Sequence, residues 1–340
     1  MILSRMAYQL IVIALILAGL YLGQHLIIPF IVALVVWYLL NSLGDLFGKI
    51  KFKKKSMPRI WQLLLGLVLF LVVSFMIIQL VISNFEVFEK SYPVYHNNFI
   101  ILTESISKTY EIDLSSVKLE ENFNLPTLLA GAVDSSLGFV ASFFLVLLYV
   151  IFLLLEQQIF QHKIRLIFNE RTEYVKFLGI VKKVDESIHS YVTIKTSLCF
   201  LGGVLSYIVM LILQVDFAFL WAFLIFLFNF IPIIGAFIGV LFPSLIAILQ
   251  FGSWLEPVLV ISLLSAIQLV LGNLVEPKIL GTKLNLSPLV VIISLSFWGA
   301  LWGVAGMFLC VPITVMLMIV FAQFKETKNI AILLSGGRGV

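Results

Sequence analysis

Charged side chains are scarce in this sequence. Asp, Glu, Lys and Arg make up 12% of the 340 residues, whereas about a quarter of an ordinary soluble domain is charged. Apolar residues account for 61% of the chain, and its mean hydropathy is +1.13. A water-soluble fold has too little interior to bury so much apolar surface. The composition therefore excludes an ordinary soluble protein and leaves lipid as the solvent.

Cysteine and histidine are also scarce. The two cysteines, Cys199 and Cys310, both lie in apolar runs, which excludes a disulfide framework and favours small core residues. The four histidines lie in separate segments, at His25, His96, His162 and His189. The chain has no H-E-x-x-H pair, nucleophile elbow, Cys/His metal spacing or Walker A motif. We therefore predict no catalytic residue, no metal site and no cofactor.

Long runs without a charged residue dominate the chain. A hydrocarbon core about 30 Å thick is crossed by roughly 20 apolar residues in a helix. Six runs are close to this length: Met6–Gln24, Leu26–Gly44, Ile60–Phe85, Ser135–Leu155, Thr196–Val215 and Pro257–Val275. Two more are about twice as long: Phe217–Leu255 and Leu284–Phe324. We predict an all-α, polytopic integral membrane protein with about eight transmembrane helices.

The first apolar run has one feature of a signal peptide, because Arg5 precedes it. However, the run Met6–Leu22 is long for such a segment, and no A-x-A-like cleavage site follows it. The next apolar run opens almost at once, at Leu26. We therefore expect an uncleaved first helix.

The positions of Lys and Arg predict the orientation in the membrane. With the N-terminus inside, all but three of the 22 basic residues lie on the cytoplasmic side, as positive-inside topology requires. We predict a multi-pass protein of the bacterial inner (plasma) membrane with both termini cytoplasmic. The net charge of +4 is then the sum of a basic inside and an acidic outside. It does not indicate a nucleic-acid partner; membrane lipid is the expected one.

This orientation divides the chain into five stretches. Residues 1–84 are predicted to hold the first transmembrane helices and a basic cytoplasmic loop, and 85–134 an extracytoplasmic helical segment. Residues 135–195 should hold a transmembrane helix and a cytoplasmic amphipathic helix. Residues 196–324 should form the transport core with two hairpins, followed by a cytoplasmic tail at 325–340.

Two segments outside the predicted membrane core show an apolar stripe at helical spacing. The first consists of Phe85, Phe88, Tyr92, Tyr95, Phe99, Leu102, Ile106 and Tyr110, and we expect Pro93 to kink or restart its helix. The second consists of Phe177, Ile180, Val181, Val184, Ile188 and Tyr191. The second stripe suits a helix on the cytoplasmic interface that enters its span near Thr196, and equally a contact with a neighbouring subunit.

Helix-breaking residues interrupt both double-length runs. They are Asn229, Pro232, Gly235, Gly239 and Pro243 in one run, and Gly299, Gly303, Gly306 and Pro312 in the other. Paired interruptions of this kind are typical of broken or re-entrant hairpins at the substrate sites of secondary transporters. Glycines four residues apart are also common where two helices pack tightly. Both interpretations remain open for each single glycine.

The connection between the two runs carries buried polar groups. Gln268 and Asn273 lie too deep to be wetted freely, so we expect each to form a hydrogen bond, and Pro277 should end the span. Glu276 is the acid nearest the hydrophobic layer. A carboxylate there suits coupling to H⁺ or Na⁺; the alternative is an ion pair with Lys278 or Lys283.

At these positions the sequence resembles the AI-2E family of bacterial transporters, also called the autoinducer-2 exporter or UPF0118 family. The resemblance lies in Asn-Phe-Ile-Pro-x-x-Gly at 229–235, Asn-Leu-Val-Glu-Pro-Lys-Ile-x-Gly at 273–281, and Ser-Pro-Leu at 287–289 running into Gly299, Gly303, Gly306 and Pro312. It implies a transporter with re-entrant hairpins that assembles as a homo-oligomer, a pentamer in the family. It also implies autoinducer-2 export or Na⁺/H⁺ exchange. Ala236 stands where the family often has proline, which predicts a softer bend.

Two other classes of function fit the sequence less well than transport does. A membrane enzyme requires clustered nucleophiles, bases or metal ligands, and this sequence has no such cluster. A membrane scaffold would not need two interrupted hairpins, although it is compatible with them. We predict an exporter or secondary transporter of a small neutral solute, with cation coupling through Glu276 as the alternative.

Overall fold

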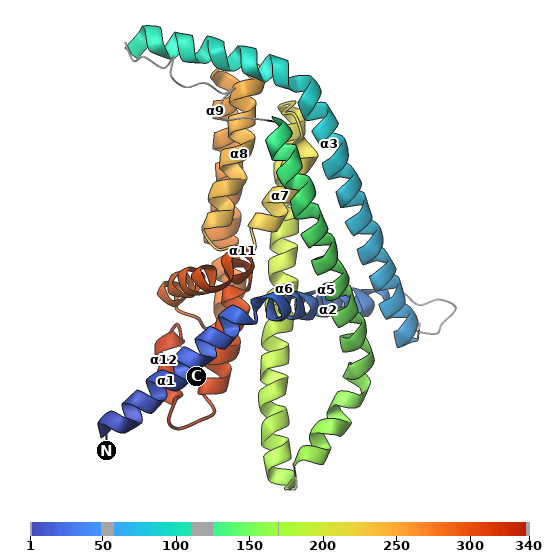
Figure 1. Ribbon diagram of the computed structural model, residues 1–340, viewed down its shortest axis with the longest axis vertical. Helices are drawn as coiled ribbons and strands as arrows, with labels where there is room; N and C mark the ends of the chain where they lie inside the picture. The colour runs from blue at the N-terminus through green and yellow to red at the C-terminus, as the bar shows by residue number, and fades with distance from the viewer. Residues whose placement is uncertain (1, 49–57, 111–124, 169, 338–340) are drawn as a thin grey trace. The chain divides into compact units, whose positions relative to one another are not determined.

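The computed structural model describes residues 2–48, 58–110, 125–168 and 170–337 (Figure 1). Apart from one isolated β-bridge, the regular structure of these residues is helical. The helices are α1 Ile2–Leu22, α2 Gln24–Gly48, α3 Arg59–Tyr110, α5 Leu125–Ile167, α6 Arg171–Ile212, α7 Ala218–Phe228, α8 Ile234–Phe251, α9 Leu255–Leu269, the π-helix η1 Val270–Val275, α10 Glu276–Leu284, α11 Pro288–Phe321 and α12 Lys328–Leu334.

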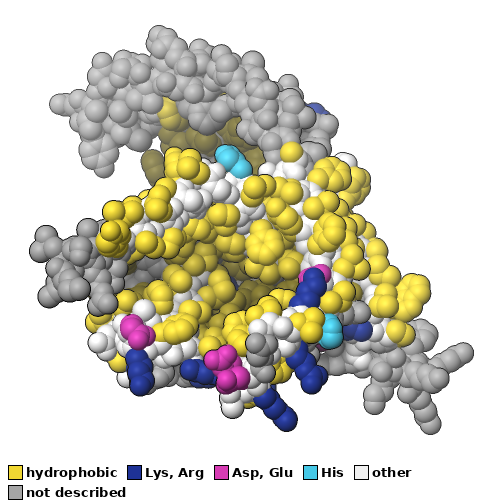
Figure 2. Space-filling view, turned by 60° about the horizontal axis from the view of Figure 1, so that its bottom comes forward, with side chains coloured by type: hydrophobic (Ala, Val, Ile, Leu, Met, Phe, Trp, Pro, Cys, Tyr) yellow, Lys and Arg dark blue, Asp and Glu magenta, His cyan; other side chains and the backbone are white. Residues whose placement is uncertain are grey.

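Six of these helical stretches are long and apolar enough to cross a membrane. They are Gln24–Asp45, Arg59–Leu80, Arg171–Ile212, Ile234–Phe251, Leu255–Leu280 and Pro288–Phe321. Three shorter apolar helices accompany them, at Ile11–Leu22, Ala141–Gln157 and Ala218–Phe228. Figure 2 shows broad areas of hydrophobic side chains on the described surface with few charged ones among them. The prediction of an all-α, polytopic membrane protein is confirmed.

The chain divides into two compact units. The first unit comprises Met1–Lys49, Gly138–Thr193 and Lys283–Val340, and the second comprises Ile50–Leu137 and Ile194–Thr282. Each unit contains one of the two double-length apolar runs, folded as a hairpin. Both cysteines are buried and free, as expected of small core residues.

In the second unit, the run at 217–255 forms the hairpin of α7 and α8. Helix α7 has 11 residues, which corresponds to about 17 Å and is too short to cross a hydrocarbon core of about 30 Å. The chain turns back through Ile233, whose φ is 66°. A Cβ on Gly235 would lie 1.9 Å from the carbonyl oxygen of Phe228, so only glycine permits this close return. Pro243 lies inside α8 and does not interrupt it.

In the first unit, the run at 284–324 forms a hairpin within α11. The helix folds at Gly303, where φ is 60° and ψ is −140°. A Cβ on Gly306 would lie 1.9 Å from the carbonyl oxygen of Trp298. The Ser294 hydroxyl lies 2.5 Å from that of Thr314 and donates to the Cys310 carbonyl oxygen at 3.0 Å, which joins the two arms. Pro312 lies inside the second arm and is not a point of interruption.

Helix α3 packs its second half against α7 and α8. It is one bent helix with Pro93 inside it, so Pro93 does not restart the helix (Figure 1). The Tyr95 hydroxyl donates to Asp216 Oδ2 at 2.6 Å, and Asn98 Nδ2 donates to the carbonyl oxygen of Leu249 at 2.8 Å. Tyr95 and Leu102 are buried, which confirms the predicted apolar face at these positions.

The second predicted stripe lies at the start of α6. Ile188 and Tyr191 are buried in the first unit, whereas Lys182 and Lys183 are exposed. The Tyr38 hydroxyl of α2 donates to Asp185 at 2.8 Å on the same stretch. Helix α6 runs without a break from Arg171 to Ile212. The stripe is therefore the first part of the helix that carries the span, rather than a separate helix that turns near Thr196.

Candidate functional site

A polar cavity of about 250 Å³ lies in the second unit, at the tip of the α7–α8 hairpin. Helices α6 and α9, the hairpin and η1 all contribute to it. Its lining is Lys195, Leu198, Cys199, Asn229, Ile231, Pro232, Ile233, Ala236, Gln268, Leu269, Leu271, Gly272, Asn273 and Glu276. Five residues predicted from the sequence are thus brought together: Asn229, Pro232, Gln268, Asn273 and Glu276.

The other predicted residues have different positions. Gly235 and Gly239 pack the hairpin: a Cβ on Gly239 would lie 3.1 Å from Ile225 Cγ1 and 3.6 Å from Gln268 Nε2. Pro277 is the second residue of α10, a position at which the missing backbone N–H of proline is tolerated. It therefore does not end the helical run. The remaining three are Gly299, Gly303 and Gly306, which belong to the hairpin of the first unit and are not part of this lining.

An ion pair between two helices forms one wall of the cavity. Lys195 Nζ of α6 lies 2.5 Å from Glu276 Oε1 at the start of α10. The Lys195 side chain is 4% exposed and that of Glu276 is 30% exposed. A buried ammonium group requires a partner of opposite charge, because its desolvation is not offset otherwise. The carboxylate is the member of the pair that a solute can reach.

The sequence suggested the ion pair but not this partner for Glu276. Lys278 is exposed, and the side chain of Lys283 lies outside the described residues. Lys195 ends the stretch for which the sequence predicts a cytoplasmic amphipathic helix. A usable signal was its register: Ile188, Tyr191, Lys195 and Cys199 recur at helical spacing, which places the lysine on the buried face of α6.

Gln268 brings an unsatisfied donor to the cavity. Its side chain is 8% exposed, and its Nε2 has no hydrogen-bond partner among the described residues. The hydrogen bond expected of this nitrogen is therefore not made within the described residues. Asn273 is exposed rather than deeply buried. Buried donors without an acceptor are rare in proteins, so the Gln268 amide calls for an acceptor oxygen from a water or a solute.

The backbone next to Gln268 is a π-helix. Val270–Val275 has the wider turn of this form, and Leu271, Gly272 and Asn273 from it line the cavity. Short π-helical insertions are frequent at functional sites. A Cβ on Gly272 would meet no atom within 4 Å, so the absent side chain leaves open space beside the amides. Apart from Gly272, no residue pattern in this segment predicts a π-helix.

Glycines of α6 bring that helix close to the hairpin. A Cβ on Gly202 would lie 3.1 Å from Asn229 Nδ2, and a Cβ on Gly203 would lie 3.0 Å from the carbonyl oxygen of Ala222. The pair therefore sets how closely α6 approaches α7 and holds Asn229 at the cavity. Sequence reasoning missed these two positions, although adjacent glycines inside a predicted span were a signal of close helix packing.

The arrangement suits recognition of a small polar molecule. Three carboxamides offer donors and acceptors, and the Lys195–Glu276 pair adds one group of each charge without net charge. Hydroxyl and carbonyl oxygens would satisfy the Gln268 amide. A multiply charged molecule would have to break the ion pair, because the cavity offers it no uncompensated charge.

Comparison with known proteins gives an independent result. The model of the AI-2E family transporters matches residues 10–326. The AI-2 transport protein TqsA of Escherichia coli is 29% identical over 337 residues, which cover 97% of this chain and 95% of TqsA. A predicted transport protein of Haemophilus influenzae is 31% identical over 345 residues, which cover 98% of this chain and 96% of that protein.

Proposed function

The chain belongs to the AI-2E family of membrane transporters, and we propose that its solute binds in the polar cavity at the tip of the α7–α8 hairpin. The protein moves a solute across a membrane, and its family is one of transporters rather than of enzymes. The observation that carries the proposal is the unsatisfied, buried Gln268 amide beside the Lys195–Glu276 pair. Ionisable and polar groups within membrane-spanning helices are costly, and they frequently line a solute or ion pathway.

The size and neutrality of the cavity point to a small, uncharged, hydroxylated solute. Its volume of about 250 Å³ is below the roughly 300–1,000 Å³ of sites for drug-sized ligands. A relative over nearly the full length is named for AI-2 transport. We therefore propose export of autoinducer-2 or a solute of the same class through this site.

The second candidate function is Na⁺/H⁺ exchange through Glu276. It is favoured by the greater exposure of this carboxylate compared with its lysine partner. A cation that takes the carboxylate leaves the Lys195 ammonium buried without a partner, which costs about 3–5 kcal/mol. Exchange therefore requires Lys195 to lose its proton or to move when the cation binds.

Flux in proteoliposomes separates the two functions. The key variant is Lys195→Gln combined with Glu276→Gln, which removes both charges and retains two polar side chains. If a neutral solute is carried, the double variant keeps solute flux and each single variant loses it, because only the single variants leave a buried charge without its partner. If exchange is the function, the double variant loses cation-dependent flux. A folded wild-type protein that moves no solute or cation under any gradient would instead support a membrane scaffold.

We also propose an inner-membrane orientation with both termini cytoplasmic, based on the placement of Lys and Arg. Both native cysteines are buried, so single introduced cysteines report sidedness with little background. Lys328→Cys should resist a membrane-impermeant maleimide in intact cells, and Lys90→Cys should react. Both positions are exposed on the protein. The reverse labelling pattern would overturn this topology.

The resemblance to the family leads us to propose a homo-oligomer, with a pentamer as the expected form. Native mass spectrometry of the full chain released from nanodiscs measures the copy number directly. A single protomer mass under conditions that preserve other membrane complexes would contradict this proposal.

A further inference from the structure

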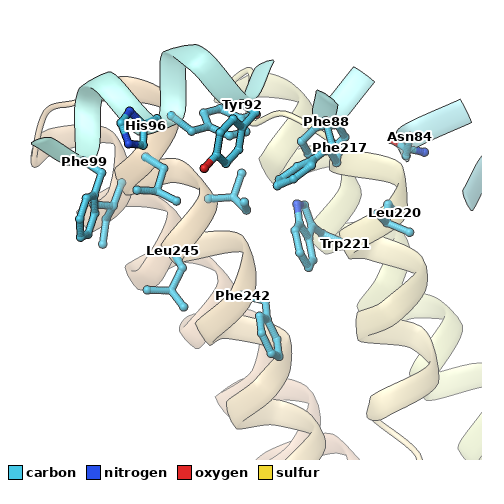
Figure 3. Close-up of a pocket in the computed structure, with 14 residues that line it drawn as sticks. Asn84, Phe88, Tyr92, His96, Phe99, Phe217, Leu220, Trp221, Phe242 and Leu245 are labelled. Carbon is cyan, nitrogen blue, oxygen red and sulfur yellow. The ribbon is translucent and has the colours of Figure 1, made fainter. Parts of the chain in front are cut away.

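A second cavity of the same unit is almost entirely apolar. It has a volume of about 710 Å³ and lies between α3, α7 and α8. Figure 3 shows Tyr92, His96 and Phe99 of α3 over one side, with Trp221 of α7 and Phe242 and Leu245 of α8 below them. No Lys, Arg, Asp or Glu is among its lining residues. It is separate from the polar cavity, with which it shares no residue.

The cavity lies at the depth of the membrane boundary. The charge-free run that contains the span of α3 ends at Phe85, and the lining on α3 begins next to this end, at Asn84. On α8 the lining lies in the last turns of its span, from Leu245 to Leu249. Tyr and Trp side chains concentrate at this depth in membrane proteins, where lipid ester groups also lie. The carbonyl end of a lipid acyl chain therefore lies at the level of this cavity.

The cavity is open toward the surroundings of α8. Phe242 is 44% exposed and Leu245 is 45% exposed, although both line the cavity. An acyl chain can thus enter sideways from the bilayer. The lining has no Lys or Arg to neutralise a phosphate and no Asp or Glu to pair with an amine, so we expect a charged headgroup to stay outside.

One polar group in the cavity lacks a partner. Trp221 Nε1 is buried and has no hydrogen-bond acceptor among the described residues. Two other polar groups of the lining are engaged: the Tyr95 hydroxyl donates to Asp216, and Asn84 Nδ2 donates to the Leu80 carbonyl oxygen at 2.6 Å. An indole N–H is only a donor, so its complement is an acceptor such as an ester carbonyl oxygen.

We propose that this cavity is a binding site for one acyl chain of a membrane phospholipid, with its ester carbonyl accepting from Trp221 Nε1. The apolar walls hold the hydrocarbon, the boundary depth places the ester beside the indole, and the headgroup remains at the membrane surface. This site goes beyond the solute cavity and does not depend on which solute is carried.

The test uses the full chain in nanodiscs of phosphatidylethanolamine and phosphatidylglycerol, with a trace of a phospholipid that carries a diazirine on its acyl chain. After irradiation, labelled peptides are identified by mass spectrometry. We expect labelling of 88–99 and 242–249 well above that of the exposed α3 segment 68–76. Leu245→Trp should fill the cavity and lower this labelling roughly tenfold.

Leu241→Trp is the matched control, because Leu241 is exposed one turn earlier on α8 and does not line the cavity. It should leave labelling unchanged. Phe99→Trp fills the cavity from the opposite wall and serves if Leu245→Trp does not fold. Trp221→Phe keeps the ring and removes the donor, so it should abolish a preference for diester over diether phospholipid.

Several results would overturn the proposal. Equal labelling in Leu245→Trp and wild type would mean that the chain lies on the general lipid surface. Labelling by a photoactivatable palmitate but not by the phospholipid would make the ligand a free fatty acid. Intermolecular protein crosslinks from 88–99 to a second copy would mean that the cavity is a subunit contact.

Discussion

The two hairpins are built on the same backbone device but differ in what they do with buried polar groups. In each, one glycine approaches a carbonyl oxygen so closely that a Cβ would lie 1.9 Å away: Gly235 at Phe228, and Gly306 at Trp298. In the α11 hairpin the buried Ser294 and Thr314 satisfy each other. Beside the tip of the α7–α8 hairpin, Gln268 of α9 is also buried, and its amide nitrogen has no hydrogen-bond partner among the described residues. The two glycines are therefore explained by close backbone packing, whereas the unsatisfied amide indicates a binding site.

The largest effect should come from breaking the shared device. Gly235→Ala and Gly306→Ala each force a methyl group onto a backbone carbonyl, and we expect each to lose about 3 kcal/mol or more of stability. Thermal unfolding in detergent, followed by size-exclusion fluorescence, measures the loss. Gly179→Ala is the control, because a Cβ there meets no atom within 4 Å. Wild-type melting of both variants would show that the close approaches are not required.

The next effect concerns the Lys195–Glu276 ion pair beside the tip of the α7–α8 hairpin. Lys195→Met leaves Glu276 without its partner, and we expect a loss of about 2–3 kcal/mol, below the usual cost for a fully buried pair because Glu276 is partly exposed. Combining it with Glu276→Gln should recover most of the loss. Melting curves of the wild type, the two single variants and the double variant make up a double-mutant cycle, which measures the interaction between the two side chains. Strict additivity would show that the two side chains do not interact.

Removing a buried polar group should change the stability in opposite directions in the two hairpin regions. Ser294→Ala removes a satisfied buried hydroxyl from the α11 hairpin and should cost about 1 kcal/mol. Gln268→Leu removes an unsatisfied donor and should leave stability unchanged or raise it by about 1 kcal/mol. Both are measured by thermal unfolding at matched protein concentration. Equal destabilisation by the two changes would mean that Gln268 has a structural partner.

The smallest effect concerns the hydrogen bond between Tyr95 of α3 and Asp216, which precedes α7. Burial, together with the hydrogen bond to Asp216, raises the pKa of Tyr95 above its ordinary value. In the unfolded chain tyrosine ionises near pH 10, so the stability that this contact provides is present below that pH and declines above it. Melting of wild type should therefore fall more steeply between about pH 9 and 11 than that of Tyr95→Phe. Parallel curves would contradict this.

Sequence reasoning succeeded where a pattern is local. Uncharged run lengths predicted a helical membrane protein, and Gly and Pro interruptions predicted both hairpins. Tyr95 and Leu102 were placed correctly on the apolar face of α3. Four of the five cavity residues were found because polar side chains within or beside apolar runs are conspicuous, and Pro232 was found as a helix-breaking residue.

What the sequence did not predict depends on contacts between distant segments. Lys195 and Glu276 lie on different helices, and nothing local distinguishes Lys195 from a loop lysine except its register on α6. The π-helix at Val270–Val275 has no composition of its own. Pro243 and Pro312 appeared as breaks but lie inside helices, because proline removes one hydrogen bond that neighbouring packing can offset.

The most direct test of the solute site is the flux of autoinducer-2 into proteoliposomes that contain Gln268→Leu, normalised to folded protein. The proposed site predicts a loss of roughly tenfold or more, since a buried hydrogen bond to the solute is removed, with melting temperature unchanged or slightly raised. Gly179→Ala, prepared in parallel, should transport like wild type. Wild-type flux in the Gln268→Leu protein would contradict the assignment of this cavity as the solute site.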